Sequence, residues 1–293
     1  MTIGAGTQRR ADGLRGQGSN LQHPDSKSGV LPVELPRTGG SEASAARRER
    51  TVQLAVTLAP VRTPDDEPAA PRLSPDLERV AAEDLYDDAD GPEWAGLAVR
   101  GDLTGWEAER LTVTGCRLEG VVATGAVLER ARFVDVELDS CDLSGAMFEG
   151  SSFERVVLRQ CRIVGALLGG ARLRNVRIEG CKVDRSALNA TVAERLHVTG
   201  SMLVECDLRD ARWPGAVVAG CDLTGADVSG ADLRGARLSG SQLALLRGVR
   251  GLAGAEVDID QLHALAALLA ADAGIVVREV SHPDVSHDGR PSR

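Results

Sequence analysis

The chain has 293 residues, of which 43% are hydrophobic and 2% aromatic, and its formal net charge is −9. This length allows one or two domains, and the few aromatic residues favour a narrow core of Leu, Val, Ile and Ala. The negative charge argues against direct binding of nucleic acid or anionic membranes. No apolar run reaches the roughly 20 residues of a membrane helix, and the polar N-terminus lacks the apolar core of a secretory signal. We therefore expect a cytoplasmic protein.

Residues 1–73 are rich in Gly, Ser, Pro and Arg and show no sustained periodicity, which predicts a disordered tail. Within this tail the peptide GSNLQHPDSKSGVLP resembles a translation across a transfer-RNA gene, because the T-arm of such a gene reads as Gly-Ser-Asn in one frame. We hypothesise that residues 1–50 reflect a start assigned too far upstream, and that the true start lies nearer residue 50 or 74.

Residues 74–100 are predicted to form an acidic, helical entry segment. Ser74, Pro75 and Asp76 combine an N-cap residue, a proline at the first helical position and an acid in the first turn, so we expect a short helix through about Tyr86. Residues 65–93 carry eleven acidic residues against two arginines. We expect this solvated segment to cover the first exposed edge of the structure that follows.

A repeat of five residues then governs the sequence. Every fifth residue from Leu103 to Leu243 is apolar, with no insertion to break the register. A small or medium residue lies two positions before each, and glycine is common two positions after. A period of five belongs to neither helices nor strands. A fixed period sustained over so many residues is the sequence signature of a solenoid.

This A(D/N)LXX-like pattern resembles the pentapeptide-repeat family over about half of the chain. The resemblance implies an all-β fold: a right-handed quadrilateral parallel β-helix over residues 101–246, in which each pentad forms one side of a square. A period of twenty in the smaller inward position supports four sides independently. One such column is Cys141, Cys161, Cys181, Ser201 and Cys221. With coils about 4.8 Å apart, the rod is expected to be roughly 35 Å long.

Residues 247–278 are predicted to form a C-terminal cap, followed by a disordered tail at 279–293. Asp258 and Gln261 resemble a capping box, and a helix over about 259–273 would end at Gly274. We expect the helix to cover the open end of the tube, since an uncapped solenoid exposes unpaired backbone groups. The family resemblance also implies a homodimer through this cap. The candidate capping or dimerisation residues are Leu262, Leu265, Leu268 and Leu269.

Nothing in the pattern predicts catalysis, a metal or a cofactor. The six cysteines occupy the smaller inward position, are spaced by multiples of five and include no C-x₂-C pair, which predicts buried packing residues. The five histidines have no catalytic partner at a recognisable spacing. The sequence contains no nucleophile elbow, P-loop or dinucleotide fingerprint. We therefore expect a protein that is not an enzyme.

One side of the predicted tube is a candidate face for a protein partner. An apolar column twenty residues apart at an outward position lies beside a column of carboxylates. The alternatives are that the protein tolerates exposed apolar side chains or that the N-terminal segment folds over them. Basic residues in 155–195 scatter over several sides and are interpreted as a solvated shell. The candidate face comprises Glu109, Val127, Glu129, Met147, Glu149 and Leu167.

These observations favour a non-enzymatic structural or protein-interaction module with an unidentified protein partner. The family resemblance implies an alternative, a DNA-mimic regulator of DNA gyrase or topoisomerase that gives quinolone or toxin protection. Acidic residues in 65–154 favour this alternative, whereas the basic middle coils weaken it because a mimic needs continuous negative columns. The unbroken register weakens it further, since the family's gyrase-binding loop interrupts the coils.

Overall fold

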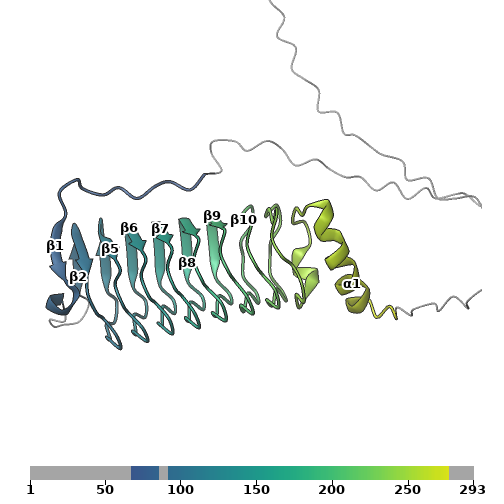
Figure 1. Ribbon diagram of the computed structural model, residues 1–293, viewed down its shortest axis with the longest axis horizontal. Helices are drawn as coiled ribbons and strands as arrows, with labels where there is room; N and C mark the ends of the chain where they lie inside the picture. Colours follow the sequence, from purple (N-terminus) through teal and green to yellow (C-terminus); the bar gives the residue numbers. More distant parts are fainter. Residues whose placement is uncertain (1–66, 86–91, 277–293) are drawn as a thin grey trace, which may run out of the picture. The chain divides into compact units, whose positions relative to one another are not determined.

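The computed structural model describes residues 67–85 and 92–276. Most of this part of the chain forms short parallel strands that stack along one axis (Figure 1). Along the main path the strands follow the order β1-β3-β5-β6-β7-β8-β9-β10, while β2 pairs with β4 and β4 with β6. The strands are β1 (Glu78–Ala81), β2 (Glu93–Ala95), β3 (Leu97–Arg100), β4 (Thr112–Thr114), β5 (Arg117–Glu119), β6 (Arg132–Asp139), β7 (Ser152–Arg159), β8 (Arg172–Glu179), β9 (Val192–Thr199) and β10 (Val217–Ala219).

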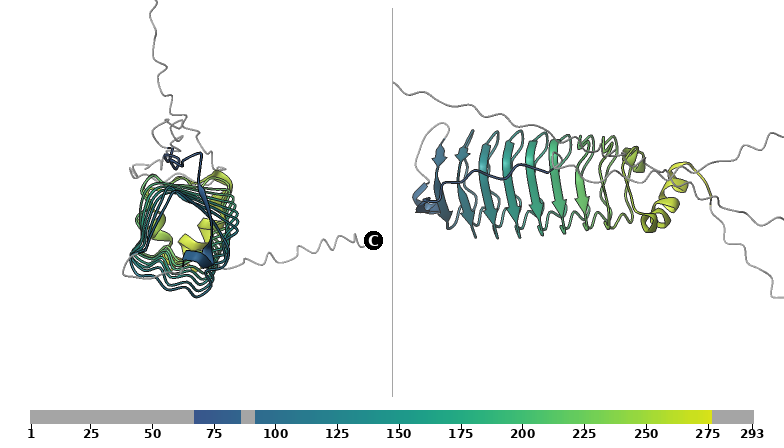
Figure 2. Two further views of the ribbon diagram at one scale, coloured as in Figure 1. Left: turned by 90° about the vertical axis from the view of Figure 1, so that its left-hand side faces the viewer. Right: turned by 90° about the horizontal axis from the view of Figure 1, so that it is seen from above.

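Each coil has four sides, and along the axis the coils superpose as a square (Figure 2). Backbone pairs join residues twenty apart on all four sides, which confirms the predicted right-handed quadrilateral β-helix. In one coil the first, second, third and fourth sides are residues 141–145, 146–150, 151–155 and 156–160. Their links to the next coil are Asp142↔Arg162, Met147↔Leu167, Phe153↔Leu173 and Leu158↔Ile178.

The register changes only near the two ends of the described coils. Trp94 pairs with Val113, and Arg237 bridges to Glu256, so both links span nineteen residues instead of twenty. Between these ends the ladder runs without interruption from the bridge at Asp102 to the bridge at Arg247. The five-residue repeat therefore maps onto a continuous stack of equal coils.

The core is a single column of apolar side chains inside the tube. The large repeat residue and the residue two positions before it point inward, as predicted, and are buried on successive coils. Phe133 and Phe153 stack with ring centroids 4.9 Å apart and an interplanar angle of 2°, and Phe148 meets both rings edge-on. The aromatic residues thus pair across neighbouring coils, at the distances at which aromatic rings attract each other.

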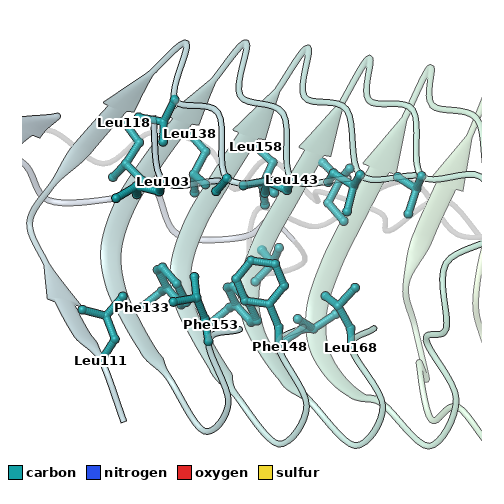
Figure 3. A pocket seen from close by; sticks show the side chains of 18 of the residues that line it. Leu103, Leu111, Leu118, Phe133, Leu138, Leu143, Phe148, Phe153, Leu158 and Leu168 are labelled. Carbon is teal, nitrogen blue, oxygen red and sulfur yellow. The ribbon is translucent and has the colours of Figure 1, made fainter. Parts of the chain in front are cut away.

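The tube encloses a narrow apolar cavity of about 60 Å³. Its lining side chains point inward from opposite sides of the coils (Figure 3). A ligand site needs a few convergent polar groups to orient its occupant, and this cavity is lined by aliphatic and aromatic residues alone. The cavity therefore reflects core packing. Figure 3 labels Leu103, Leu111, Leu118, Phe133, Leu138, Leu143, Phe148, Phe153, Leu158 and Leu168.

The chain turns each corner at a residue with positive φ. Gly115 and Gly120 adopt φ values of 61° and 63°, which glycine does readily because it has no Cβ. Residues with a side chain bear about 1–2 kcal/mol of strain in this conformation, so interactions of the corner side chain must offset it. At the corner between the third and fourth sides such residues follow one another: Asp135, Arg155, Asn175 and Arg195.

The predicted helix from Ser74 to Tyr86 is wrong over its described part. Residues Glu78–Ala81 form β1, which pairs in parallel with β3, and η2 (Ala82–Leu85) is a short 3-10 helix. The cap-like Ser74 makes a local turn, in which the Asp76 amide donates to its hydroxyl at 3.3 Å. The exposed edge of β3 offers β1 a full ladder of backbone bonds, and this tertiary pairing outweighs the local helix signal. As expected, the entry segment covers that edge.

Residues 67–73 also differ from the prediction of disorder, since they lie along the coils and contact them. The rest of the predicted N-terminal tail, residues 1–66, and the predicted C-terminal tail at 279–293 lie outside the described residues.

The predicted C-terminal helix is confirmed. After η3 (Val249–Leu252) the chain forms η4 (Ile259–Gln261) and α1 (Leu262–Asp272), and both halves of the Asp258–Gln261 capping box are present. The Gln261 side-chain amide donates to the carbonyl oxygens of Leu238 and Ser241, at 2.7 and 2.6 Å. The cap therefore satisfies backbone acceptors of the last coil as well as covering its core.

Ala193 offers a direct test of the core register. It is 5% exposed, pairs with Leu173 and lies one coil from the buried Trp213, whose indole donates to Thr191 Oγ1 at 2.9 Å. We expect Ala193→Leu to overpack this site and lower the free energy of unfolding by about 1–3 kcal/mol, measured by denaturant titration. Ala244→Leu, at an exposed position, is the matched control and should change stability little; equal stability of both variants would contradict the register.

Candidate functional site

The apolar column of the candidate face is assembled as the sequence predicted. Val127, Met147, Leu167 and Ala187 are joined by consecutive bridges on the second side. Each of these side chains is half-buried, which corrects the expectation that the column is exposed. Coils about 4.8 Å apart bring neighbouring side chains of one column into contact, so each covers part of the next. The column is a shallow apolar strip on the rod.

The carboxylates beside this column are partly neutralised by an arginine. Glu109 and Glu149 are exposed and Glu129 is half-buried. Arg130 donates to Glu109 at 3.1 Å from the neighbouring coil. This pair is largely solvated, so it adds little stability, but it neutralises part of the acidic column. The column also ends one coil further on, where Gly169 occupies the equivalent position.

Charges of both signs are mixed on the fourth side. Arg117 pairs with Glu137 at 3.0 Å, and Arg159 pairs with Glu179 at 3.2 Å, in each case across one coil step. Arg100 and Glu119 continue the ladder toward the N-terminal end. These pairs bring a cation opposite each of these acids, so this side does not present a continuous negative column.

The corner between the third and fourth sides carries a less exposed ion pair that the sequence did not indicate. Arg155 binds Asp135 through two hydrogen bonds, at 2.7 and 2.8 Å, and their side chains are only 18% and 13% exposed. The Arg155 guanidinium holds the pKa of the Asp135 carboxyl below its usual range. The signal that could have revealed this corner is the run of polar residues at positions where the repeat elsewhere places glycine.

Residues 67–73 pack on this same corner, near Asp135 and Asn175, and not on the apolar column. The alternative in which the N-terminal segment covers the candidate face is therefore wrong for these residues. The candidate face and the covered corner lie on different sides of the rod.

The six cysteines are buried and unpaired. Burial raises the pKa of the Cys206 thiol to about 12, and it also raises the pKa of Cys116 and Cys221. A thiol is reactive as its thiolate, so these environments suit packing and not nucleophilic chemistry. Among the described residues no group of three or more His, Cys, Asp and Glu side chains is placed to hold a metal ion.

The four cap leucines divide between two environments. Leu265 is 5% exposed and belongs to the core, and Leu268 is half-buried against it. Leu262 and Leu269 are 46% and 49% exposed. One face of α1 thus covers the tube, and the outward leucines remain accessible for a further contact.

Within the described ranges, no helix has the length and apolar character to cross a membrane.

Comparison with known proteins places the repeats in a family. Residues 116–155, 151–189 and 203–240 match the family model described as Pentapeptide repeats, in eight copies. No curated protein matches the chain. Among solved structures, a pentapeptide repeat protein from the Arabidopsis thaliana thylakoid lumen is 28% identical, with a TM-score of 0.31 over 32% of this chain. The match covers 65% of that protein, just under two thirds of its length.

Two further solved structures match the chain at lower identity. HetL, a pentapeptide repeat protein involved in heterocyst differentiation regulation in the cyanobacterium Nostoc, is 17% identical over 58% of this chain and 90% of its own, with a TM-score of 0.29. Full-length QnrB1, a plasmid-mediated fluoroquinolone resistance protein, is 22% identical over 68% of this chain and 95% of its own, with a TM-score of 0.28.

The burial of the thiols predicts their chemical protection. In the native protein at pH 8 we expect none of the six cysteines to react with Ellman's reagent within minutes, and all six to react after unfolding in guanidinium. Ala244→Cys places one thiol at an exposed position and should add a single rapid equivalent. Rapid reaction of the native wild-type protein would show that a thiol is accessible and contradict the packing role.

Proposed function

Because this chain belongs to the pentapeptide-repeat family, we propose that it acts as a non-enzymatic rod that presents a binding face to a protein partner. Members of this family are structural and interaction modules. A closed ladder around a packed core holds the outward side chains at fixed spacing, so a partner meets a surface that is already ordered. The chemistry that such a partner needs follows from the face.

The observation that carries this proposal is the apolar column beside the acidic column on the second side. Val127, Met147 and Leu167 supply apolar area, and Met adapts its shape to a partner surface. Glu129 and Glu149 lie along one border of this strip. We infer a partner with an apolar ridge and basic residues at its rim, since carboxylates at the edge of an interface steer a positively charged partner.

The absence of catalytic function is part of the same proposal. The cysteines that carry raised pKa values lie inside the tube. The internal cavity is apolar and offers no acid, base or oxyanion donor to a substrate. These features support the proposal that the protein binds its partner on the outer surface of the rod and that the interior residues serve only to pack the core.

A DNA-mimic regulator of DNA gyrase or topoisomerase, which would protect against quinolones or toxins, is the second candidate. The stacked carboxylates of Glu109, Glu129 and Glu149 favour it. The ion pairs of the fourth side and the basic residues of 155–195 oppose it, because they interrupt the negative potential that replaces a DNA backbone. The uninterrupted coils from Leu103 to Leu243 also lack an inserted binding loop.

We further propose that two copies associate through the outward side of α1. Leu262 and Leu269 are its exposed apolar residues, and their burial against a second copy would remove them from water. Such a dimer would present two candidate faces on one assembly, which would strengthen binding to a repetitive or dimeric partner.

Charge substitutions test the candidate face. We expect Met147→Lys with Leu167→Lys to weaken binding of the proteins that the wild type captures by about tenfold or more, since losing about 1.4 kcal/mol at a central contact has that effect. Quantitative pull-down compares the wild type and the variant. Val192→Lys with Met202→Lys is the matched control, because these apolar residues are exposed on other sides. Unchanged capture by a folded Met147/Leu167 variant would remove this face from consideration.

A gyrase assay separates the two candidate functions. We expect the full chain, at micromolar concentration, to leave DNA gyrase supercoiling and fluoroquinolone-stabilised cleavage unchanged, because its surface charge is mixed. The readout is the topoisomer distribution with and without the drug. Inhibition, or protection from cleavage, would favour the DNA-mimic function instead.

A further inference from the structure

Residues 67–73, the strap, run lengthwise over the coils before the chain enters β1. The strap is the dark blue segment above the coils in Figure 1 and crosses them in the right-hand view of Figure 2. Its sequence, EPAAPRL, contains Pro68 and Pro71. Proline restricts the backbone to extended conformations and leaves fewer amides to satisfy. The strap therefore suits recognition along a surface better than pairing in a ladder.

One end of the strap is held at β8. Asn175 Oδ1 accepts a hydrogen bond from the Ala69 amide at 3.2 Å, and Arg177 donates to the Pro68 carbonyl oxygen at 2.6 Å. Arg177 also lies 3.6 Å from the Glu67 carboxylate. Two side chains of the coil thus recognise a backbone donor, a backbone acceptor and an acid on consecutive strap residues.

The other end of the strap is held at β6. The Arg72 amide donates to Asp135 Oδ1 at 2.9 Å. Asp135 is already oriented by its two hydrogen bonds from Arg155. From Ala69 to Arg72 the strap advances three residues while crossing two coil steps of about 4.8 Å, or about 3.2 Å per residue. This rise is that of an extended or polyproline II chain.

Between these two ends lies an apolar outward residue that is covered. Val157 of β7 pairs with Glu137 on one side and Arg177 on the other, so its column points away from the core. It is nevertheless 1% exposed, and the corner residue Asn175 is 7% exposed. The corner thus combines an apolar centre with polar groups at both ends, as a binding site for a peptide does.

We propose that this corner is a binding site for an extended, proline-containing peptide led by an acidic residue, that residues 67–73 occupy it in cis, and that a partner carrying such a segment binds by displacing them. Asn175 and Arg177 bind backbone groups and one acidic side chain of the strap. Any extended peptide that begins with an acidic residue can supply the same groups. The site lies away from the second side, so the inference is independent of the function proposed above.

The strap can leave without disturbing the coils. It is held by side-chain contacts and lies outside the parallel ladder, so its release is a local opening. Its tether to β1 gives it an effective concentration on the order of millimolar, and a free peptide must compete with that. We therefore expect an added peptide to bind weakly to the wild type, and more tightly to a variant whose strap no longer binds the corner.

Hydrogen exchange of the full chain tests whether the strap occupies the corner. We expect the Ala69 and Arg72 amides, which donate to Asn175 and Asp135, to exchange at least tenfold more slowly than in an unfolded peptide. Asn175→Gly with Arg177→Ala should abolish the protection of Ala69, because it removes the contacts that hold this end of the strap. Glycine is compatible with the positive φ of position 175, so the coil should persist. The control, Gln160→Gly with Arg172→Ala, alters another positive-φ corner and an arginine of β8 that is not one of the strap's hydrogen-bond partners named above, and should retain protection. Unprotected amides in the wild type would overturn the proposal.

Peptide binding tests whether the corner accepts a segment in trans. A fluorescent peptide of residues 65–75 is titrated into the full chain and into Glu67→Lys with Ala69→Pro, which removes the acid and the amide donor from the strap but leaves the corner intact. We expect at least tenfold tighter binding to this variant than to the wild type, and loss of binding when Asn175→Gly and Arg177→Ala are added. No binding to the strap variant would overturn the proposal. Light scattering that shows a dimer, dissociated by Asn175→Gly with Arg177→Ala, would also overturn it, because the strap would then occupy the corner of a second copy and not its own.

Discussion

The parallel ladder that joins each residue to the one twenty positions later is the interaction on which the rest of this structure depends. The ladder can close on four sides only if the chain turns a corner every five residues, with positive φ at the turn. That turn directs the large repeat residue and the residue two before it inward on every side. Inside the tube, residues twenty positions apart then pack on each other, as Phe133 stacks on Phe153. Core, corner and surface columns are therefore consequences of one register.

The same register determines what the surface can do. Side chains twenty residues apart become neighbours, so a short pattern in the sequence becomes a column on the rod. Alternating acids and arginines form a ladder of ion pairs, as at Arg117 and Glu137, whereas apolar residues form a strip. Individual exposed pairs add little stability, but together they set the electrostatic character of a side. This is why the fourth side is mixed in charge while the second side retains an acidic border.

The two proposed binding surfaces arise from this arrangement in different ways. The column around Met147 is a straight repetition of one outward position and has no occupant among the described residues. The corner around Asn175 departs from the repeat, since side chains stand where glycine is usual, and it holds the strap. Strain at a corner persists when surrounding contacts compensate it. Asp135 illustrates this, because its carboxylate binds both Arg155 and the Arg72 amide.

The sequence alone determined the repeat, the four-sided coil, the inward residues, the buried cysteines and the C-terminal cap, because each depends on spacing within or between adjacent coils. Local pattern also placed the Met147 column correctly. Only the tertiary structure decided that residues 78–81 join the sheet as β1 instead of forming a helix, that the Met147 column is half-buried, and that the strap reaches Asn175. These outcomes depend on contacts between segments as much as 109 residues apart and on an open strand edge, and no local propensity encodes such contacts.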